Sequence, residues 1–275
     1  MGRARKATKA RGRMRFDRKA LLAFLFICLL LLFNDLGEDQ ALVVDVIDGD
    51  TIVALTDRGQ RETIRYLLID TPELHHPNRG REELGEEAKG FNASLVLNNK
   101  VRIELDKQER DKYDRLLAYV WVDTSQGERM VNEALVEEGL ALPYIIPPNG
   151  KYLNAIMEAT KRARSRNVGL WKRAQGRIFT PDQIYSELPY LAGSFVTIKI
   201  KIDKIEKSGS RWILSQGKSK CRLVIYDNNE YLLPVKDSLI GREVKVVGKV
   251  AASHAGAEIV ISDPAQIISK SPVGE

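Results

Sequence analysis

The chain has 275 residues, enough for two domains of ordinary size, and its net charge is +6. Residues 1–19 carry nine Lys or Arg and one Asp, a net charge of +8, which leaves −2 for the rest of the chain. The bulk of the chain is therefore not globally basic, and any contact with nucleic acid must be local. The two cysteines, Cys28 and Cys221, cannot form a disulfide framework, so we expect both to be packing residues.

An unbroken apolar run covers residues 20–33, directly after the basic tail. This pattern is typical of a signal peptide or a signal anchor. The run is shorter than the roughly 17 to 25 residues of a membrane span, which favours a cleaved signal. Residues 34–40 (NDLGEDQ) contain no small-x-small cleavage site, which favours an uncleaved anchor. We expect a membrane-anchored protein with the chain after this segment outside the cytoplasm, or a secreted protein if the segment is cleaved.

The first strands flank a turn that carries two acids. Two apolar runs, 42–47 and 52–55, lie on either side of residues 48–51 (DGDT). Asp-Gly between apolar runs is a strong hairpin signal. The pattern therefore predicts an antiparallel hairpin with Asp50 at its tight turn.

The next strand is expected over residues 63–69, and it leads into residues 70–73 (DTPE). Pro72 cannot donate to a sheet and favours an extended residue before it, so the strand ends here. Asp70 and Glu73 then lie at the mouth of a strand, where they can point at a ligand. Taken alone, a surface turn with solvated acids is the simpler interpretation.

The remaining elements of this half alternate between strands and helices. Five strands that close into a small barrel with an inserted helix form the oligonucleotide-binding (OB) architecture. Apolar residues at helical spacing and acids in the first turn predict the inserted helix. Two more strands are expected at 101–105 and 116–122, and helices at 82–98, 131–138 and 152–166.

Three separated stretches supply charged groups of complementary chemistry. The carboxylates are Asp50, Asp70 and Glu73, and the guanidinium groups are Arg65 and Arg115. Carboxylate oxygens suit a hard cation such as calcium, and the planar forks of two arginines suit a phosphate. A third carboxylate that does not bind the cation can act as a general base on water. The set is that of metal-assisted phosphodiester hydrolysis, and magnesium or manganese stay open as the metal.

Residues 42–171, about half of the chain, resemble the staphylococcal nuclease (thermonuclease) family. The matching segments are 46–51 (VIDGDT), 65–73 (RYLLIDTPE), 111–119 (DKYDRLLAY) and 131–136 (VNEALV). Several spaced motifs in the same order make the resemblance specific. It implies the OB-type barrel and a calcium-dependent nuclease that cleaves DNA and RNA, leaving 3′-phosphate ends.

The resemblance also implies the metal ligands and the base. Asp50 and Asp70 look like the calcium-ligating carboxylates, with the backbone carbonyl of Thr71 as a third ligand. Glu73 looks like the base that activates water.

The phosphate and substrate contacts follow in the same way. Arg65 and Arg115 look like the pair that holds the phosphate and stabilises the charge of the transition state. The positions implied to contact the nucleotide are Lys112, Tyr113 and Tyr144.

Two positions depart from the family pattern. Asp114 replaces the usual glycine and adds a negative charge near the phosphate site, and Ile146 stands where a second base-stacking tyrosine is common. Because every catalytic group is retained, we favour an enzyme. The alternatives are a catalytically silent module that binds nucleic acid at the membrane and a structural membrane protein whose barrels make protein contacts.

A second pattern of strands follows the nuclease-like part. Its alternating runs predict a second, smaller OB-like barrel similar to nucleic-acid-binding domains attached to nucleases and helicases. Its strand lysines, with Trp212 and Tyr226, could line a groove in which the bases of a single strand stack. A structural barrel with ordinary solvated lysines is an equally good interpretation. The expected organisation is an α+β chain with a nuclease domain at 38–172, a linker at 173–192 and an OB-like domain at 193–270.

Overall fold

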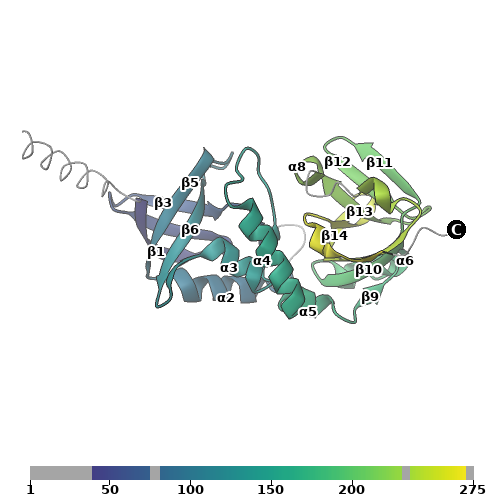
Figure 1. Cartoon of the computed structure of the whole chain (residues 1–275), viewed down its shortest axis with the longest axis horizontal. Coiled ribbons are helices and arrows are strands. Elements are labelled where there is room, and N and C mark those ends of the chain that lie inside the picture. The colour runs from purple at the N-terminus through teal and green to yellow at the C-terminus, as the bar shows by residue number, and fades with distance from the viewer. Residues whose placement is uncertain (1–38, 75–80, 231–235, 271–275) are drawn as a thin grey trace, which may run out of the picture. The chain divides into compact units, whose positions relative to one another are not determined.

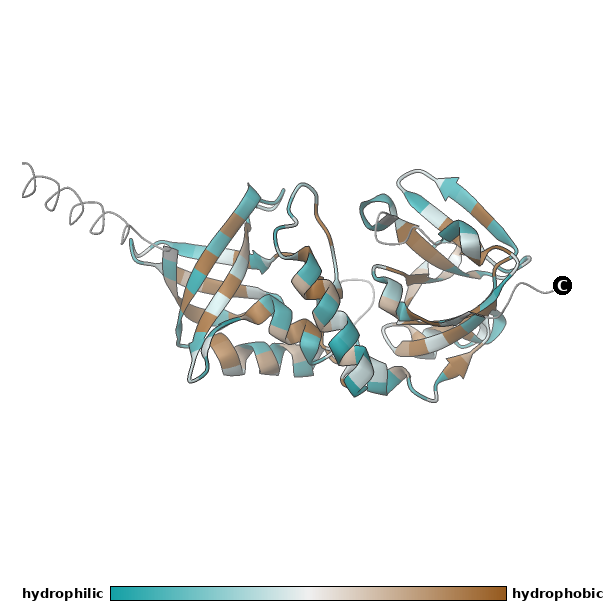
Figure 2. Cartoon of the chain, in the orientation of Figure 1, coloured by the Kyte–Doolittle hydropathy of each residue, from teal (hydrophilic) through white to brown (hydrophobic). Residues whose placement is uncertain are grey.

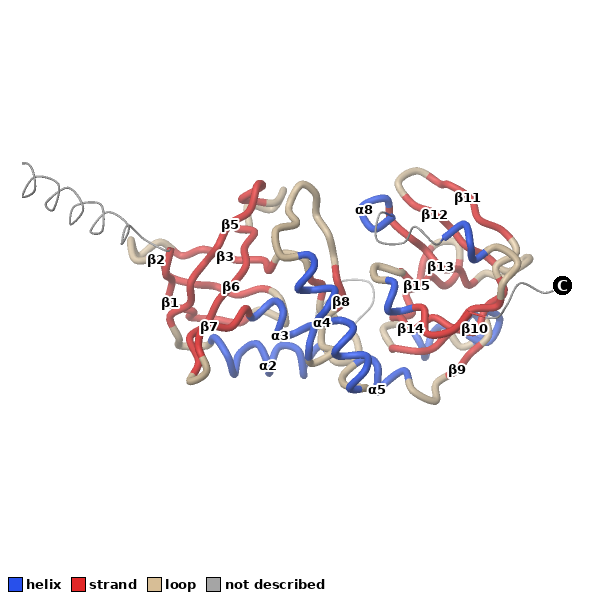
Figure 3. The backbone as a smooth tube through the Cα atoms, in the orientation of Figure 1, coloured by secondary structure: helices blue, strands red, loops and turns tan. Residues whose placement is uncertain are grey.

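The computed structural model describes residues 39–74, 81–230 and 236–270. The expected basic tail and apolar segment, 1–33, lie outside these residues. Within the described ranges, no helix is both long and apolar enough to cross a membrane. The chain from Asp39 onward forms one compact unit, and its strands gather into two groups (Figure 3).

The first group is a closed five-stranded barrel (Figure 1). Its strands follow the order β3-β2-β1-β5-β6, and a parallel pairing of β3 with β6 closes it. This confirms the OB-type barrel expected from the sequence. The strands are β1 (Asp39–Val46), β2 (Thr51–Thr56), β3 (Arg61–Tyr66), β5 (Lys100–Arg110) and β6 (Leu116–Thr124), and β7 (Gly127–Met130) extends the sheet beyond β6.

Helices cover the barrel and share its core. Apolar residues run along the strands (Figure 2), and the largest fully buried side chains include Tyr66 and Tyr119. Helix α2 contributes Ala88 and Val96, both fully buried, as the helical spacing predicts. The helices are α2 (Gly85–Val96), α3 (Val131–Glu137), α4 (Leu153–Arg166) and α5 (Leu170–Ala174).

The strand expected over residues 63–69 is interrupted. β3 ends at Tyr66, a turn covers Leu67 and Leu68, and the short β4 (Ile69–Asp70) follows, paired with β8 (Leu142–Pro143). Leu68 has φ 65°, an unfavourable value for a leucine. Its carbonyl accepts a hydrogen bond from the amide of Tyr144 (2.9 Å), and the carbonyl of Leu67 accepts one from Nδ2 of Asn132 (2.9 Å). These distant partners hold the turn, which alternation along the strand could not reveal.

We call the part from β9 to β16 the second β domain. Its path β11-β12-β13-β15-β14-β10 has β13 and β15 parallel, as β3 and β6 are in the first barrel. Because β10 and β11 are consecutive pieces of chain on either side of Ile202 and Asp203, the path returns to its start with OB connectivity. Its strands are β9 (Ile178–Phe179), β10 (Phe195–Lys201), β11 (Lys204–Ser208), β12 (Arg211–Ser215), β13 (Cys221–Tyr226), β14 (Glu243–Ser253), β15 (Gly256–Val260) and β16 (Ile267–Lys270).

Short helices lie within the second β domain. Residues 173–192, expected to link the domains, contain α6 (Pro181–Ser186) and α7 (Leu188–Leu191), and Ile184 is fully buried in the core of the second β domain. Two residues of that domain's β10 and β14, Phe195 and Val247, belong to the core of the first barrel. The domain limits given above stay a prediction. The second β domain also contains α8 (Asp227–Glu230) and two 3₁₀ turns, Lys236–Leu239 and Pro264–Gln266.

Candidate active site

The turn between β1 and β2 fixes the position of Asp50, which is only 4% exposed. A side-chain oxygen of Asp48 accepts the amide of Asp50 (3.1 Å), a local turn typical of aspartate. The carbonyl of Asp48 accepts Nδ2 of Asn92 on α2 (3.2 Å), and Oδ1 of Asn92 accepts the hydroxyl of Tyr66 (2.8 Å). The turn is therefore tied to a helix and to a neighbouring strand.

Gly49 lets this turn approach its neighbours closely. A Cβ at this position would lie 2.7 Å from Cβ of Ala88 and 2.7 Å from Cγ2 of Thr71, well inside contact distance. The glycine in the hairpin motif is thus required by packing at the site.

Gly49→Ala is expected to lower the free energy of unfolding by about 1–3 kcal/mol, because the added methyl group overpacks the site. It should also lower catalytic activity, because Thr71 and Asp50 must move apart. The matched control is Gly90→Ala on α2, where an added Cβ meets nothing within 4 Å. Chemical denaturation and initial rates check both variants, and equal losses in the two would contradict the assigned role of Gly49.

Arg65 lies between the two predicted metal-ligating carboxylates. Its Nη2 is 3.2 Å from Oδ2 of Asp50 and 3.1 Å from Oδ1 of Asp70. Its Nη1 donates to the carbonyls of Tyr66 (2.7 Å) and Ile69 (2.9 Å), so the side chain spans the turn between β3 and β4. The structure therefore brings Asp50, Asp70 and Arg65 together.

Thr71 faces Asp50 directly. Its amide and its hydroxyl both donate to Oδ2 of Asp50, at 2.8 Å and 3.0 Å. These bonds orient the carboxylate and place Thr71, whose carbonyl is the third predicted ligand, beside it.

The site carries more negative than positive charge. Burial raises the pKa of Asp50, and the attraction of Arg65 opposes this only in part. Burial also raises the pKa of Asp70, against the opposing charges of Lys249 and Arg65. For Arg65, burial would lower the pKa, but Asp50 and Asp70 outweigh it and hold the pKa above its ordinary value.

A divalent cation fits this donor set. Carboxylate and carbonyl oxygens are the ligands of hard cations, and a cation would offset the repulsion between the carboxylates. Within the described ranges, no cluster of three or more His, Cys, Asp or Glu side chains has the arrangement of a metal site. The predicted site relies on two carboxylates and a backbone carbonyl.

Glu73 lies beyond the two aspartates with an exposed side chain. Partial burial raises the pKa of its carboxyl group, and the neighbouring charges of Asp70 and Asp50 raise it further. Its amide donates to Oε2 of Glu82 (2.8 Å), so its backbone is fixed while its carboxylate faces solvent. This is the arrangement required of a base that acts on water.

Arg115 comes from the turn before β6. Its Nε and Nη2 both lie 2.8 Å from Oδ2 of Asp111, which orients the guanidinium group. Arg65 pairs in register with Leu117, two residues beyond Arg115, so the two arginines come from neighbouring, paired strands. Tyr113 is 68% exposed, with Lys112 4.9 Å from its ring centroid.

Two further positions complete the comparison with the sequence. Tyr144 is partly exposed and directly follows β8, which pairs with Asp70 on β4, so it lies at the edge of the site. Burial, followed by the charge of Asp70, raises its pKa. Asp114 has φ 65°, the conformation that favours the glycine it replaces. Its carboxylate is 89% exposed and lies 3.7 Å from Arg110, so its charge is directed toward Arg110.

Three supporting residues were not singled out from the sequence. Asn92 lies on the buried stripe of α2, four residues from Ala88 and from Val96, and a polar residue at that spacing was a usable signal. Asn132 lies inside a family motif, but its contact with the turn at Leu67 could not be read from spacing. Glu82, which binds the amide of Glu73, resembled an ordinary helix-start acid.

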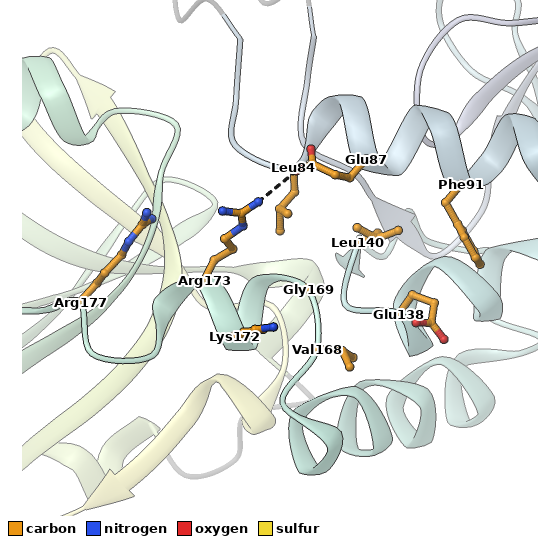
Figure 4. A pocket seen from close by; sticks show the side chains of 10 residues that line it. All are labelled: Leu84, Glu87, Phe91, Glu138, Leu140, Val168, Gly169, Lys172, Arg173 and Arg177. Atoms are coloured by element: carbon orange, nitrogen blue, oxygen red, sulfur yellow. Dashed lines mark hydrogen bonds and ion pairs between the residues drawn. The ribbon is translucent and has the colours of Figure 1, made fainter.

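A pocket of about 670 Å³ lies apart from the predicted catalytic residues, and Leu84, Phe91 and Leu140 contribute to its lining (Figure 4). Its arginines already have protein partners, since Arg173 pairs with Glu87 at 3.1 Å and Arg177 pairs with Glu83 at 2.9 Å. None of the predicted catalytic residues lines it, so we assign it no part in the chemistry.

Comparison with known proteins connects this geometry to a family. Residues 63–173 match the family model described as staphylococcal nuclease homologue. The chain is 41% identical over 140 residues to the thermonuclease of Staphylococcus intermedius, an overlap of 51% of this chain and 80% of that protein. It is 41% identical over 138 residues to the thermonuclease of Staphylococcus hyicus (50% and 79%). It is 42% identical over 130 residues to the endonuclease YncB of Bacillus subtilis (strain 168), covering 46% of this chain and 59% of that protein.

Proposed function

Because the chain belongs to the staphylococcal nuclease family and is a nuclease, we propose that it is a calcium-dependent endonuclease of DNA and RNA that leaves 3′-phosphate ends. The observation that carries this proposal is the convergence of Asp50 and Asp70 on Arg65, next to Glu73. Nucleases of this family need a divalent metal ion, and the oxygen donor set favours calcium over softer metals.

Each side chain then has a role in hydrolysis. Asp50, Asp70 and the carbonyl of Thr71 would hold the ion, which would supply Lewis-acid polarisation of the phosphate. Glu73 takes a proton from the attacking water. Attack at phosphorus breaks its bond to the 5′ oxygen, which takes up a proton from water and leaves as a 5′-hydroxyl, so the phosphate stays on the 3′ side.

Arg65 and Arg115 bind the phosphate oxygens. Guanidinium forks stabilise negative charge as it builds up on these oxygens, and this stabilisation is typically a large part of catalysis. Exposed aromatic rings at Tyr113 and Tyr144 offer stacking surfaces for unpaired bases, which supports a preference for single strands. Comparison of kcat/KM on single-stranded and duplex substrates of the same sequence tests this preference.

Calcium is expected to raise the melting temperature of the protein. A ligand at about 100 times its Kd adds about 2.7 kcal/mol to the free energy of unfolding, which corresponds to several degrees. Asp50→Asn should abolish this shift and the calcium-dependent cleavage, whereas Asp45→Asn, an exposed acid on β1, should keep both. Thermal unfolding with calcium or with chelator measures the shift. An unchanged shift in Asp50→Asn would contradict the assigned ligand.

We also propose that residues 20–33 hold the protein at the membrane, with the nuclease outside the cytoplasm, or act as a cleaved signal. The basic tail and the apolar run support this proposal. Fractionation of cells, followed by protease treatment of intact cells, separates the two forms from each other and from a cytoplasmic protein.

A further inference from the structure

Glu82 is a buried acid that forms hydrogen bonds with the backbone of Glu73. Its side chain is only 1% exposed. Its Oε2 accepts the amide of Glu73 (2.8 Å), and its own amide donates to the carbonyl of Glu73 (2.9 Å). This two-way pairing fixes the backbone from which the predicted base projects.

The charge partner of Glu82 comes from the second β domain. The ammonium group of Lys249 on β14 donates to Oε2, the same oxygen that accepts the amide of Glu73. A buried carboxylate is costly unless it is paired and hydrogen-bonded. Lys249 thus provides the charge that allows Glu82 to remain buried beneath the site.

The second β domain also binds the residue next to Glu82. The amide of Phe195 donates to the carboxylate of Glu83 (2.9 Å), and the amide of Glu83 donates to the carbonyl of Gly193 (3.0 Å). Arg177, directly before β9, also pairs with Glu83 at 2.9 Å. Phe195 is the register partner of Lys249 in the β10–β14 ladder. Two adjacent strands therefore hold two consecutive residues of the segment behind Glu73.

We propose that Lys249 is a positioning residue of the nuclease reaction: it acts through Glu82 to hold Glu73, so that the second β domain completes the active site. This proposal rests on the proposed role of Glu73 as the base. It assigns to the second β domain a structural part in catalysis at the first barrel, independent of any ligand of its own.

The test measures kcat and KM of the full chain carrying Lys249→Met or Lys249→Arg. Small displacements of a catalytic group are costly, so we expect Lys249→Met to lower kcat about 10- to 100-fold with KM changed less than about 3-fold. Lys249→Arg, which keeps a charged donor, should recover most of the rate. Lys199→Met is the matched control, because Lys199 lies on the neighbouring strand in an exposed pair with Glu243 at 3.2 Å.

A double-mutant cycle then tests the route through Glu82. If Lys249 acts on the rate through Glu82 rather than through its charge on Asp70, Lys249→Met should lower kcat little further in a Glu82→Gln background. Additive losses in this cycle would overturn the proposal. So would normal kcat in Lys249→Met, or equal loss in Lys199→Met. The assays are run at a temperature at which circular dichroism shows that each variant is folded. If Lys249→Met is unfolded, the rates of Lys249→Arg and Glu82→Gln decide whether the proposal holds. If Glu73→Gln also keeps its rate, the proposed base is wrong; if only Lys249→Met does, this inference alone fails.

Discussion

Glu73→Gln is expected to lower kcat by about 10²- to 10⁴-fold, the usual contribution of a general base. Binding of nucleic acid should persist, because glutamine has the same shape and Arg65 and Arg115 are unchanged. The amide of Glu73 would still donate to Glu82, so the backbone at this position should stay in place. Single-turnover cleavage and equilibrium binding measure the two properties separately.

The pH dependence provides an independent check of the same residue. Since the base must be ionised, the rate falls as pH drops through the pKa of Glu73. Partial burial, then Asp70 and Asp50, raise that pKa in the protein without a bound cation, so Glu73 should there titrate at higher pH than a fully solvated, isolated glutamate. A bound cation opposes the contribution of the two aspartates. The residual rate of Glu73→Gln should lack this step. The exposed Glu86→Gln on α2 is the control, and a near-normal rate for Glu73→Gln would exclude Glu73 as the base.

Arg65→Lys is expected to lower activity by about 10²- to 10³-fold, although it keeps the positive charge. The fork of Arg65 contacts two carbonyls through Nη1 and two carboxylates through Nη2, and a single ammonium group cannot cover this set. Lost hydrogen bonds to buried acceptors should also lower the free energy of unfolding by about 1–3 kcal/mol.

The control for this exchange is Arg162→Lys on α4. Arg162 also binds two acids, Glu133 at 2.7 Å and Glu137 at 3.0 Å, but on the protein surface. Exposed pairs contribute up to about 1 kcal/mol, so this variant should be nearly as stable and active as the wild type. If Arg65→Lys behaved in the same way, its charge alone would suffice and the geometric argument would be wrong.

The first barrel and the set of carboxylates and arginines could be predicted from the sequence, whereas the ion pairs of Asp50 and Asp70 with Arg65 were not predicted. The Asp-Gly turn, the proline after Asp70 and the helical spacing in α2 each act over a few residues, and each is confirmed. The interruption of β3 could not be predicted in this way. The carbonyls of Leu67 and Leu68 are bound by Asn132 and by the amide of Tyr144, both far along the chain.

The contribution of the second β domain was equally hidden. In the sequence, Lys249 looks like one of several solvated lysines on a strand. Only the tertiary structure shows that it forms an ion pair with Glu82. Several of those lysines pair with nearby acids, as Lys201 does with Asp203 at 3.8 Å. A groove for single strands on this domain therefore stays a prediction.

The most direct test of the proposed chemistry maps the ends of the products. The chain from residue 36 onward would be incubated with single-stranded and duplex DNA, with calcium or with chelator. We expect cleavage only with calcium, and products that carry 3′-phosphates and 5′-hydroxyls. Absence of cleavage with any divalent ion, together with retained binding of single strands, would contradict the proposed enzyme and indicate a nucleic-acid-binding module.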